Sequence, residues 1–572
     1  MMENSGVSIF CKNDGKNHKV ELGTTLGSLS KKWCKTVLDE KTGQRLDVIA
    51  ALVDNKLKEL EYKPMLFHQV EFIGFNHPDG RRCYLRSLCF VLQNTVRELY
   101  PDKVLAVCHS LPSGLYCEIH EKVKNDDGKP NIYFIKDDEL DAIRKKMKEI
   151  IARDLPFRKE KVFVEDAIQI FRDNNQPMKA ELQESVGNFI CSVYYLDGKA
   201  DTFHGPLIPS TGYLKTFDIS PVGDGFCLHG PMMTDFSKVM PLKRQAKIAA
   251  TLKEYSDWCS IINIESVGSL NSAVKEGKAV RIINLAEALH ERSYARIADM
   301  IRDSHKRIVM IAGPSSSGKT SSSLRIALQC KVIGLNPKVI ELDNYFVDRD
   351  KTPVDEDGKL DFESLHAMDL DFLNQQLNEL LEGKEVEIPK YDFKGGRRVF
   401  SGNTLQLEDK DILIMEGIHA LNPEMTSAVD QSKIFRVYAS ALTSLNIDEN
   451  VNLSTSDNRL LRRMVRDNRV RGITPEQTIL RWNSVRRGES KNIFPFQENA
   501  DALFNSALIF ELPLLKYYAE PLLRRISPTS PAYTETVRLL KFLDYIVALQ
   551  PSEIEAIPPT SIIREFIGGQ TL

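Results

Sequence analysis

In the second half of the chain, short apolar runs end in a glycine or an acidic residue and are separated by stretches with helical spacing. The runs are RIVMIAG (307–313), VIELD (339–343) and DILIMEG (411–417). Strands that are apolar at nearly every position lie in parallel sheets covered on both faces, and their alternation with helices is typical of an α/β fold. The pattern therefore predicts an α/β domain over residues 305–512.

The first half has more local patterns. VSIF (7–10) and KVEL (19–22) alternate like strands, residues 24–37 have helical spacing, and NHPDGRR (76–82) resembles a turn-rich boundary. We expect a small module over 1–78 and an α+β module over 79–240, the latter with helices at 85–100 and 137–153. We also expect a helical connector over 241–304, which is broken at KEGK, and a C-terminal helical tail over 513–572.

Composition narrows the possible functions only modestly. The 572 residues include 76 basic and 79 acidic side chains, giving a net charge of −3, so no global positive field attracts nucleic acid or an anionic membrane. The ten cysteines are scattered without a Cys-x-x-Cys pair, which favours reduced thiols. The first residues lack an apolar signal segment, and no apolar run reaches 18 residues. We expect a cytoplasmic enzyme.

One motif carries the strongest chemical signal. Gly313-Pro-Ser-Ser-Ser-Gly-Lys-Thr320 fits G-x-x-x-x-G-K-[ST], with an apolar strand before it and a helical stretch after it. In such a loop the backbone N–H groups surround the phosphates of a nucleotide, the lysine reaches the β- and γ-phosphates, and the hydroxyl holds Mg²⁺. The predicted nucleotide-binding residues are Gly313, Ser315, Ser316, Ser317, Gly318, Lys319, Thr320 and Ser321.

Two acidic residues follow predicted strands at the edge where open α/β sheets bind ligands. Asp343 is placed to accept the proton of an acceptor hydroxyl, although an aspartate after a strand is often only a turn or helix-capping residue. Glu416 is suited to Mg²⁺, with a surface carboxylate as the alternative. The basic stretch from Arg459 to Arg471 is either a phosphate-contacting lid or a solvated helix face.

The order of GPSSSGKT, LDNYF, IPKYDF, ILIMEGIHALNP and RRMVRDNRVRG resembles the uridine kinase and phosphoribulokinase family over residues 307–508. The resemblance implies transfer of a phosphoryl group from ATP or GTP with Mg²⁺ held by Thr320 and Glu416. It implies catalytic roles for Asp343 as the base and for Lys319, Arg463 and Arg466, and a lid that also includes Arg471. The implied acceptor-binding residues are Tyr345, Phe362, Glu363, Tyr391 and Phe393.

The sequence departs from the uridine–cytidine kinase pattern in three places. Glu363 replaces the aspartate that holds the ribose hydroxyls, Gly396 stands where the pyrimidine-reading histidine is expected, and Ile473 removes one lid arginine. A uridine- or cytidine-type nucleoside is the leading acceptor. A sugar or sugar phosphate is the alternative, and a third reading is a nucleotide-gated, RNA-binding regulatory protein without kinase activity.

The front half resembles two modules of threonyl-tRNA synthetases: a TGS-like β-grasp domain, and the second additional (editing) domain. The second likeness rests on SLCFVLQNTVRELYPD, IRKKMKEIIARDLPF and FHGPLIPSTGYLKTFDI. Because the four editing-site positions hold residues that cannot ligate Zn²⁺, the resemblance implies that editing is lost and no zinc is expected. His204 is expected to be a surface or hydrogen-bonded residue. RNA binding through the front half and homo-oligomers remain open, and no membrane partner is expected. The four editing-site positions that lack a zinc ligand are Arg86, Phe90, Phe203 and Leu207.

Overall fold

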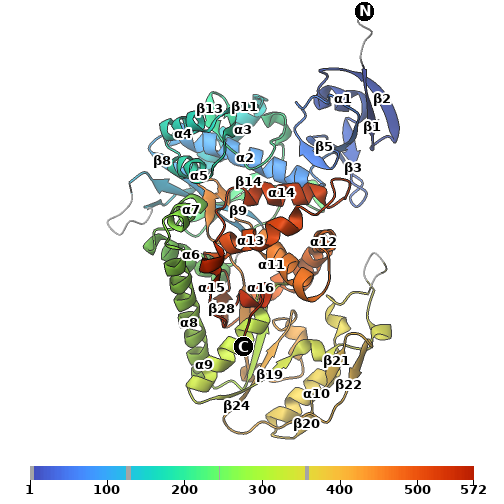
Figure 1. Cartoon of the computed structure of the whole chain (residues 1–572), viewed down its shortest axis with the longest axis vertical. Coiled ribbons are helices and arrows are strands. Elements are labelled where there is room, and N and C mark those ends of the chain that lie inside the picture. The colour runs from blue at the N-terminus through green and yellow to red at the C-terminus, as the bar shows by residue number, and fades with distance from the viewer. Residues whose placement is uncertain (1–5, 112, 124–130, 244, 355–357, 359) are drawn as a thin grey trace, which may run out of the picture.

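The computed structural model describes residues 6–572 except 112, 124–130, 244, 355–357 and 359. Figure 1 shows the N-terminal elements in the upper half of the molecule and a parallel sheet with its helices in the lower half. The last helices of the chain lie between these two halves.

The lower half is built on a five-stranded sheet in the order β19-β24-β18-β25-β28, and every pairing is parallel. Alternate residues of β18 face opposite sides of the sheet. Val309 and Ile311 pack with helices α8 (Ala279–Ser304) and α9 (Lys319–Val332), whereas Ile308 and Met310 pack with α6 (Ala246–Ile261) and α10 (Leu370–Leu381). The predicted parallel sheet covered on both faces is therefore confirmed. The strands are β18 (Ile308–Ala312), β19 (Asn336–Glu341), β24 (Asp411–Glu416), β25 (Ile434–Ser440) and β28 (Ala502–Asn505).

Further helices of this half follow or precede these strands, and three two-stranded sheets extend from it. The helices are α9 (Lys319–Val332), α10 (Leu370–Leu381), α11 (Thr455–Val470) and α12 (Pro475–Asn492). The two-stranded sheets are β20 (Val386–Glu387) with β23 (Thr404–Leu405), the hairpin of β21 (Lys390–Asp392) and β22 (Arg397–Val399), and the hairpin of β26 (Asn446–Asp448) and β27 (Val451–Asn452).

The first N-terminal sheet has the order β2-β1-β7-β5-β6, in which only β1 and β7 run parallel. Helix α1 (Leu26–Trp33) packs against it through Leu26 and Leu29. This α+β arrangement agrees with the expected β-grasp module. The strands are β1 (Gly6–Cys11), β2 (Lys16–Glu21), β5 (Ala50–Val53), β6 (Lys56–Lys58) and β7 (His68–Ile73), with β3 (Thr36–Leu38) and β4 (Arg45–Asp47) as a separate hairpin.

The next elements form two antiparallel sheets. One has the order β10-β9-β15-β14, with β8 also paired to β9, and the other has the order β11-β12-β13. Their strands are β8 (Lys103–Leu111), β9 (Gly114–Glu121), β10 (Ile132–Tyr133), β11 (Arg158–Phe163), β12 (Ile190–Leu196), β13 (Lys199–Asp201), β14 (Asp218–Val222) and β15 (Gly225–His229), and β16 (Pro231–Met232) pairs with β17 (Asp235–Val239). Helices α3 (Asp137–Ala152), α4 (Val164–Asp173) and α5 (Pro177–Ser185) accompany them.

Helix α2 (Pro78–Leu99) corrects one expectation, because it begins inside the segment predicted to be a turn-rich boundary. His77 is the N-cap, and its side chain accepts a hydrogen bond from the Asp79 amide. Pro78 stands at the first helical position, where its missing N–H costs nothing. Asn, His, Pro and Asp thus start a helix directly after the first sheet, seven residues before the helix expected at 85–100.

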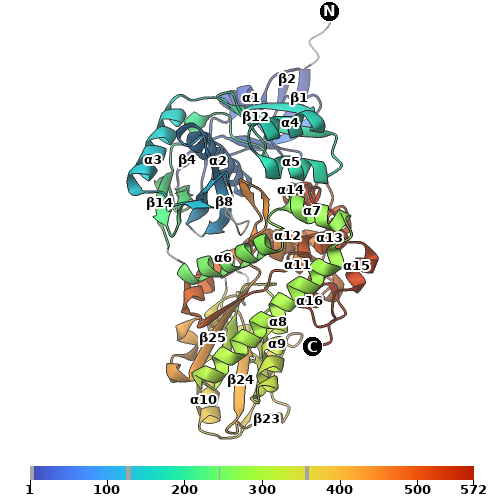
Figure 2. The same cartoon turned by 90° about the vertical axis from the view of Figure 1, so that its left-hand side faces the viewer.

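The connector contains α6 (Ala246–Ile261), α7 (Val267–Lys275) and α8 (Ala279–Ser304), with the expected break between the last two. Figure 2 shows α6 and α7 at the junction of the two halves, and α8 running along the parallel sheet. Within the described parts of the chain, no helix combines the length and apolarity required to cross a lipid bilayer.

The C-terminal helices join both halves. They are α13 (Glu511–Leu523), α14 (Tyr533–Leu543), α15 (Pro551–Glu555) and α16 (Arg564–Ile567). Beside the N-terminal elements, the Arg82 guanidinium donates to Glu535 at 2.8 Å, and Asn55 donates to the carbonyl of Pro528 at 3.2 Å. In the lower half, Arg538 donates to Asp457 of α11 at 2.7 Å. The tail therefore packs as an integral part of the structure.

A buried ion cluster connects α5 and β13 to the β26–β27 hairpin. The Lys179 ammonium contacts the Asp201 carboxylate directly and lies 3.9 Å from Asp448, and all three side chains are fully buried. It also donates to Asn450 at 2.6 Å. Burial favours the neutral form of Asp448, but Lys179 and His204 outweigh it and lower the pKa of this carboxyl. The cluster fixes the hairpin that precedes α11.

Replacing Lys179 tests this connection. Lys179→Met removes the fully buried ammonium that both carboxylates share and leaves Arg97 at 3.4 Å from Asp201 and His204 at 3.2 Å from Asp448. We expect a loss of about 3–5 kcal/mol in the free energy of unfolding. The loss is measured as a lower midpoint in urea or thermal unfolding. Lys215→Met is the matched control because its pair with Asp47 is exposed, 71% and 48%, and an exposed pair contributes about 1 kcal/mol or less. Equal effects of the two variants would contradict the assignment.

Candidate active site

The Gly313–Thr320 loop connects β18 to α9 at the carboxyl edge of the parallel sheet. Ser316 and Gly318 have left-handed backbone conformations, with φ of 58° and 83°. A Cβ on Gly313 would lie 2.0 Å from the carbonyl oxygen of Ala439, so only glycine fits there. The hydroxyls of Ser316 and Ser317 are buried without a hydrogen-bond partner among the described residues. The loop is a cradle with unused polar atoms, as a phosphate ligand requires.

Arginines of α11 donate hydrogen bonds to the backbone and a side chain of this loop. Arg459 donates to the carbonyl of Ser315 at 3.0 Å, and Arg463 donates to its hydroxyl at 2.8 Å. Glu489 of α12 accepts from the amide of Ser315 at 3.0 Å and from Arg459 at 2.8 Å. Arg462 forms the same kind of pair with Glu511, donating at 2.7 Å. Sequence reasoning missed Glu489 and Glu511, because each is far along the chain from its arginine.

The three arginines predicted to form a lid share one carboxylate. Asp467, which is almost fully buried, accepts from Arg463 at 3.2 Å and from Arg466 at 3.0 Å, and Arg471 lies 3.5 Å from it. Like charges held this close repel one another, and Asp467 offsets that repulsion. The arrangement concentrates positive charge beside the phosphate cradle.

Three carboxyl groups lie within electrostatic range of the Lys319 ammonium. Burial raises the pKa of Asp343, and the charges of Lys319 and Arg471 oppose that rise. Burial raises the pKa of Glu416 to about 7, opposed by Lys319 and by Thr320, whose hydroxyl donates to Glu416 at 2.6 Å. Burial also raises the pKa of Glu363 to about 7. Lys319 has no ion pair within 4.0 Å among the described residues, so it remains available to a ligand.

The predicted aromatic residues surround a residue that was not predicted. Phe346 is buried, and its ring centroid lies 5.9 Å from Phe362, 5.6 Å from Tyr391 and 6.4 Å from Phe393. Tyr345, which we expected in the acceptor pocket, is fully buried and donates to Gln376 of α10 at 2.9 Å. The structure therefore brings together Phe362, Tyr391 and Phe393 around Phe346 and does not bring Tyr345 to them.

Ser321 lies beside the end of the chain. Its hydroxyl donates to Glu565 of α16 at 2.6 Å and accepts from Gln570 at 2.8 Å. Ile562 approaches Gly318, where a Cβ would lie 2.4 Å from the Ile562 Cδ1 atom. The tail thus covers the start of α9, next to the phosphate cradle.

In the second N-terminal module, the four expected editing-site positions lie close together but are occupied by packing contacts. The rings of Phe90 and Phe203 are 5.2 Å apart, Arg86 donates to the Pro206 carbonyl at 2.9 Å, and Leu207 is buried in the same core. His204 is hydrogen-bonded, with Nε2 3.2 Å from the Asp448 carboxylate.

A parallel sheet with this loop after its central strand is the arrangement of a P-loop nucleotide-binding domain. The family comparison assigns this domain to the phosphotransferases. Residues 308–509 match the model of the phosphoribulokinase/uridine kinase family, and the chain belongs to that family through this part. It is similar to the uridine kinase of Macrococcus caseolyticus, 34% identical over 197 residues, which are 34% of this chain and 86% of the relative. A solved structure of a possible uridine kinase from Bacillus stearothermophilus covers 35% of this chain and 88% of its own, with 19% identity and a TM-score of 0.23.

The N-terminal half is similar to threonine–tRNA ligases. The ligase of Rubrobacter xylanophilus is 28% identical over 240 residues, which are 41% of this chain and 34% of the ligase. The chain thus spans about a third of the length of these ligases.

Removing the carboxylate behind the loop tests how the cradle is held. Glu489→Gln leaves the buried Arg459 guanidinium without its counter-charge, so we expect a loss of about 3–5 kcal/mol in stability and weaker nucleotide binding. Urea unfolding and calorimetric titration with Mg·ATP measure the two effects. Glu476→Gln on the same helix is the control, because its carboxylate accepts from the Ser530 hydroxyl and has no ion pair within 4.0 Å among the described residues. Unchanged nucleotide affinity in a folded Glu489→Gln protein would contradict this assignment.

Proposed function

We propose that the chain transfers the γ-phosphoryl group of ATP to a hydroxyl group of a uridine- or cytidine-type nucleoside. The observation that carries this proposal is the position of Lys319 within electrostatic range of Asp343, Glu416 and Glu363, beside a loop with unused polar atoms. A nucleotide switch needs no acceptor base and no second carboxylate of this kind.

In the proposed reaction the loop amides and Lys319 bind the β- and γ-phosphates. Asp343 orients the acceptor hydroxyl and takes its proton as the oxygen forms a bond to the γ-phosphorus and the bond to the β-phosphate oxygen breaks. Arg463, Arg466 and Arg471 offset the negative charge on the transferring group and exclude water from it.

The hydroxyl of Thr320 and the carboxylate of Glu416 fit Mg²⁺, because both are hard oxygen donors and lie 2.6 Å apart at the end of the loop. When bound, Mg²⁺ neutralises charge on the β- and γ-phosphate oxygens. The ATP and Mg²⁺ requirement is general for P-loop kinases of this family.

We assign acceptor binding to Glu363 and to the rings of Phe362, Tyr391 and Phe393, which gather around Phe346. Aromatic faces stack on a flat base or an apolar sugar face, and a carboxylate accepts hydrogen bonds from two neighbouring hydroxyls. Glu363 extends one methylene further than the aspartate of the resembled kinases. These features favour a nucleoside acceptor.

A specific observation favours a sugar phosphate as the second candidate. At Gly396, which replaces the expected base-reading histidine, a Cβ would lie 2.8 Å from the Arg349 guanidinium carbon. Arg349 donates to the Phe393 carbonyl at 2.6 Å and is otherwise exposed. A guanidinium at this point also suits a phosphate, which it binds with paired hydrogen bonds.

An acceptor panel with a base variant tests the reaction. With Mg·ATP we expect ADP release that depends on uridine or cytidine, and we expect Asp343→Asn to reduce kcat by about 10²- to 10⁴-fold, the usual contribution of general-base catalysis. Binding of Mg·ATP should persist in this variant. Asp350→Asn, which changes an exposed carboxylate of the next turn, is the control. Turnover with sugar phosphates alone would favour the second candidate, and no acceptor-dependent turnover would reject the proposal.

The pKa of Glu363 predicts how acceptor binding depends on pH. Burial and Glu489 raise this pKa to about 7, opposed by Arg463 and Lys319, with Asp361 adding to the rise. The carboxylate is therefore protonated below about 7 and ionised above it, so the acceptor KM should fall as the pH rises through this value. Glu363→Gln should raise that KM about 10- to 100-fold and remove its dependence on pH, because a hydrogen bond to a charged group contributes about 1.5–3 kcal/mol. Steady-state kinetics at several pH values measure this, and a variant that changes kcat alone would contradict it.

A further inference from the structure

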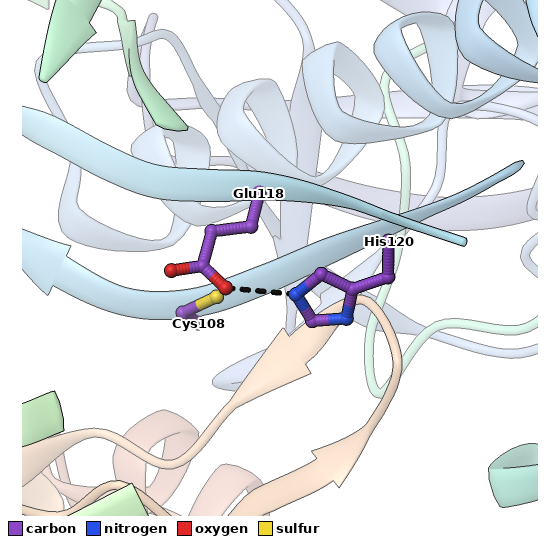
Figure 3. Close-up of side chains that lie close together, drawn as sticks. All are labelled: Cys108, Glu118 and His120. Atoms are coloured by element: carbon purple, nitrogen blue, oxygen red, sulfur yellow. Dashed lines mark hydrogen bonds and ion pairs between the residues drawn. The ribbon is translucent and has the colours of Figure 1, made fainter. Parts of the chain in front are cut away.

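Three potential metal ligands converge on the antiparallel sheet of the second N-terminal module, away from the kinase site. They are Cys108 on β8 and Glu118 and His120 on β9. Figure 3 shows their side chains pointing toward one another from the two neighbouring strands. One donor atom of each lies within 4.8 Å of the donor atoms of the other two, and this is the one such group of three or more found among the described residues.

The backbone explains why the three side chains meet. Successive residues of a strand face opposite sides, so Glu118 and His120 share the face opposite the buried Cys117 and Ile119. In the pairing of β8 with β9, Val107 is opposite Cys117 and His109 is opposite Tyr116, so Cys108 is the extra residue of a β-bulge. A bulge redirects a side chain and is frequent beside functional sites. Here it adds a thiol to the face that carries the carboxylate and the imidazole.

Glu118 is the centre of the group. Its Oε2 lies 2.7 Å from His120 Nε2, and its Oε1 accepts from the Tyr116 hydroxyl at 3.0 Å. The Glu118 and His120 side chains are 15% and 19% exposed, so they are shielded but reachable from solvent. Tyr116 occupies the position of an outer-shell partner that orients a ligating carboxylate.

The donor set selects the kind of metal. A thiolate and an imidazole suit Zn²⁺ and related transition metals, whereas Mg²⁺, Ca²⁺ and Mn²⁺ prefer oxygen donors alone. Three protein ligands with one open position are typical of zinc sites that bind water or a further ligand. Zn²⁺ is ligated by the thiolate form of cysteine, so binding releases the thiol proton of Cys108 to solvent. It also replaces the hydrogen bond between His120 and Glu118.

We propose that Cys108, Glu118 and His120 form a zinc-binding site with one position open to water or a small ligand. The site is separate from the four editing-like positions, whose side chains offer no zinc ligand. Cys108 also lies on β8, the strand that contacts the β26–β27 hairpin. There the Val107 amide donates to the Glu449 carbonyl at 3.0 Å, and Asn452 donates to the Ser110 hydroxyl at 3.2 Å. A metal here stabilises the bulge at the contact between the module and the β26–β27 hairpin.

Metal titration of the full chain tests the proposal. The protein is prepared without an affinity tag, treated with chelator and titrated with Zn²⁺, and bound metal is measured by elemental analysis. We expect stoichiometric zinc, and with Co²⁺ in its place an absorption band of thiolate-to-cobalt charge transfer. Cys108→Ser should abolish the band, and His120→Asn should abolish stoichiometric binding. Tyr116→Phe should weaken zinc binding about 10- to 100-fold, as loss of outer-shell partners does.

Two control variants separate this site from other thiols and imidazoles. Cys34→Ser removes the other cysteine that is not fully buried, and His68→Asn removes an imidazole that lies 2.6 Å from Asp54 with no role in the site. Both should retain the metal and the band. No stoichiometric metal in the folded protein, or zinc that persists in folded Cys108→Ser and His120→Asn proteins, would overturn the proposal. Kinase activity is followed separately, so loss of the proposed reaction leaves this test unaffected.

Discussion

The position of the phosphate loop depends on two buried pairs of arginine and glutamate. Arg459 with Glu489 and Arg462 with Glu511 are each at most 1% exposed. Such pairs add little net stability, because the cost of removing both charges from water offsets their attraction. Their effect here is positional: the remaining guanidinium N–H groups are directed at the carbonyls of the loop. A loop with strained residues keeps one shape only when its surroundings determine that shape.

The same helix that holds the loop also connects the two halves of the molecule. Helix α11 begins directly after the β26–β27 hairpin, which the Lys179 cluster fixes to the second N-terminal module. Near its other end, Arg469 donates to the carbonyl groups of Glu565 and Phe566 in the C-terminal tail. A packed helix is stiff, so a displacement at one end is passed along its axis. The N-terminal modules at one end of α11 and the C-terminal tail at the other therefore constrain the arginines beside the phosphate loop.

The sequence was most informative where structure is local. The apolar runs that became β18, β19 and β24 and the glycines of the loop are defined by adjacent residues, so their positions and the edge that carries Asp343 and Glu416 were predictable. Contacts between distant residues were not: Glu489 and Glu511 lie 30 and 49 positions from their arginines, and nothing in the local pattern marks them. The burial of Tyr345 was not predictable either, because it ends the short 3-10 helix Leu342–Tyr345, and the side-chain directions of such a helix do not follow from an apolar pattern.

Gly396, where the family resemblance expects a base-reading histidine, bears on the acceptor in the proposed reaction. A neutral imidazole can donate or accept a hydrogen bond, whereas the Arg349 guanidinium that fills this space can only donate. It therefore pairs with carbonyl or phosphate oxygens and leaves an amino group without an acceptor. Among nucleosides, this chemistry favours the uracil carbonyl face over the amino group of cytosine.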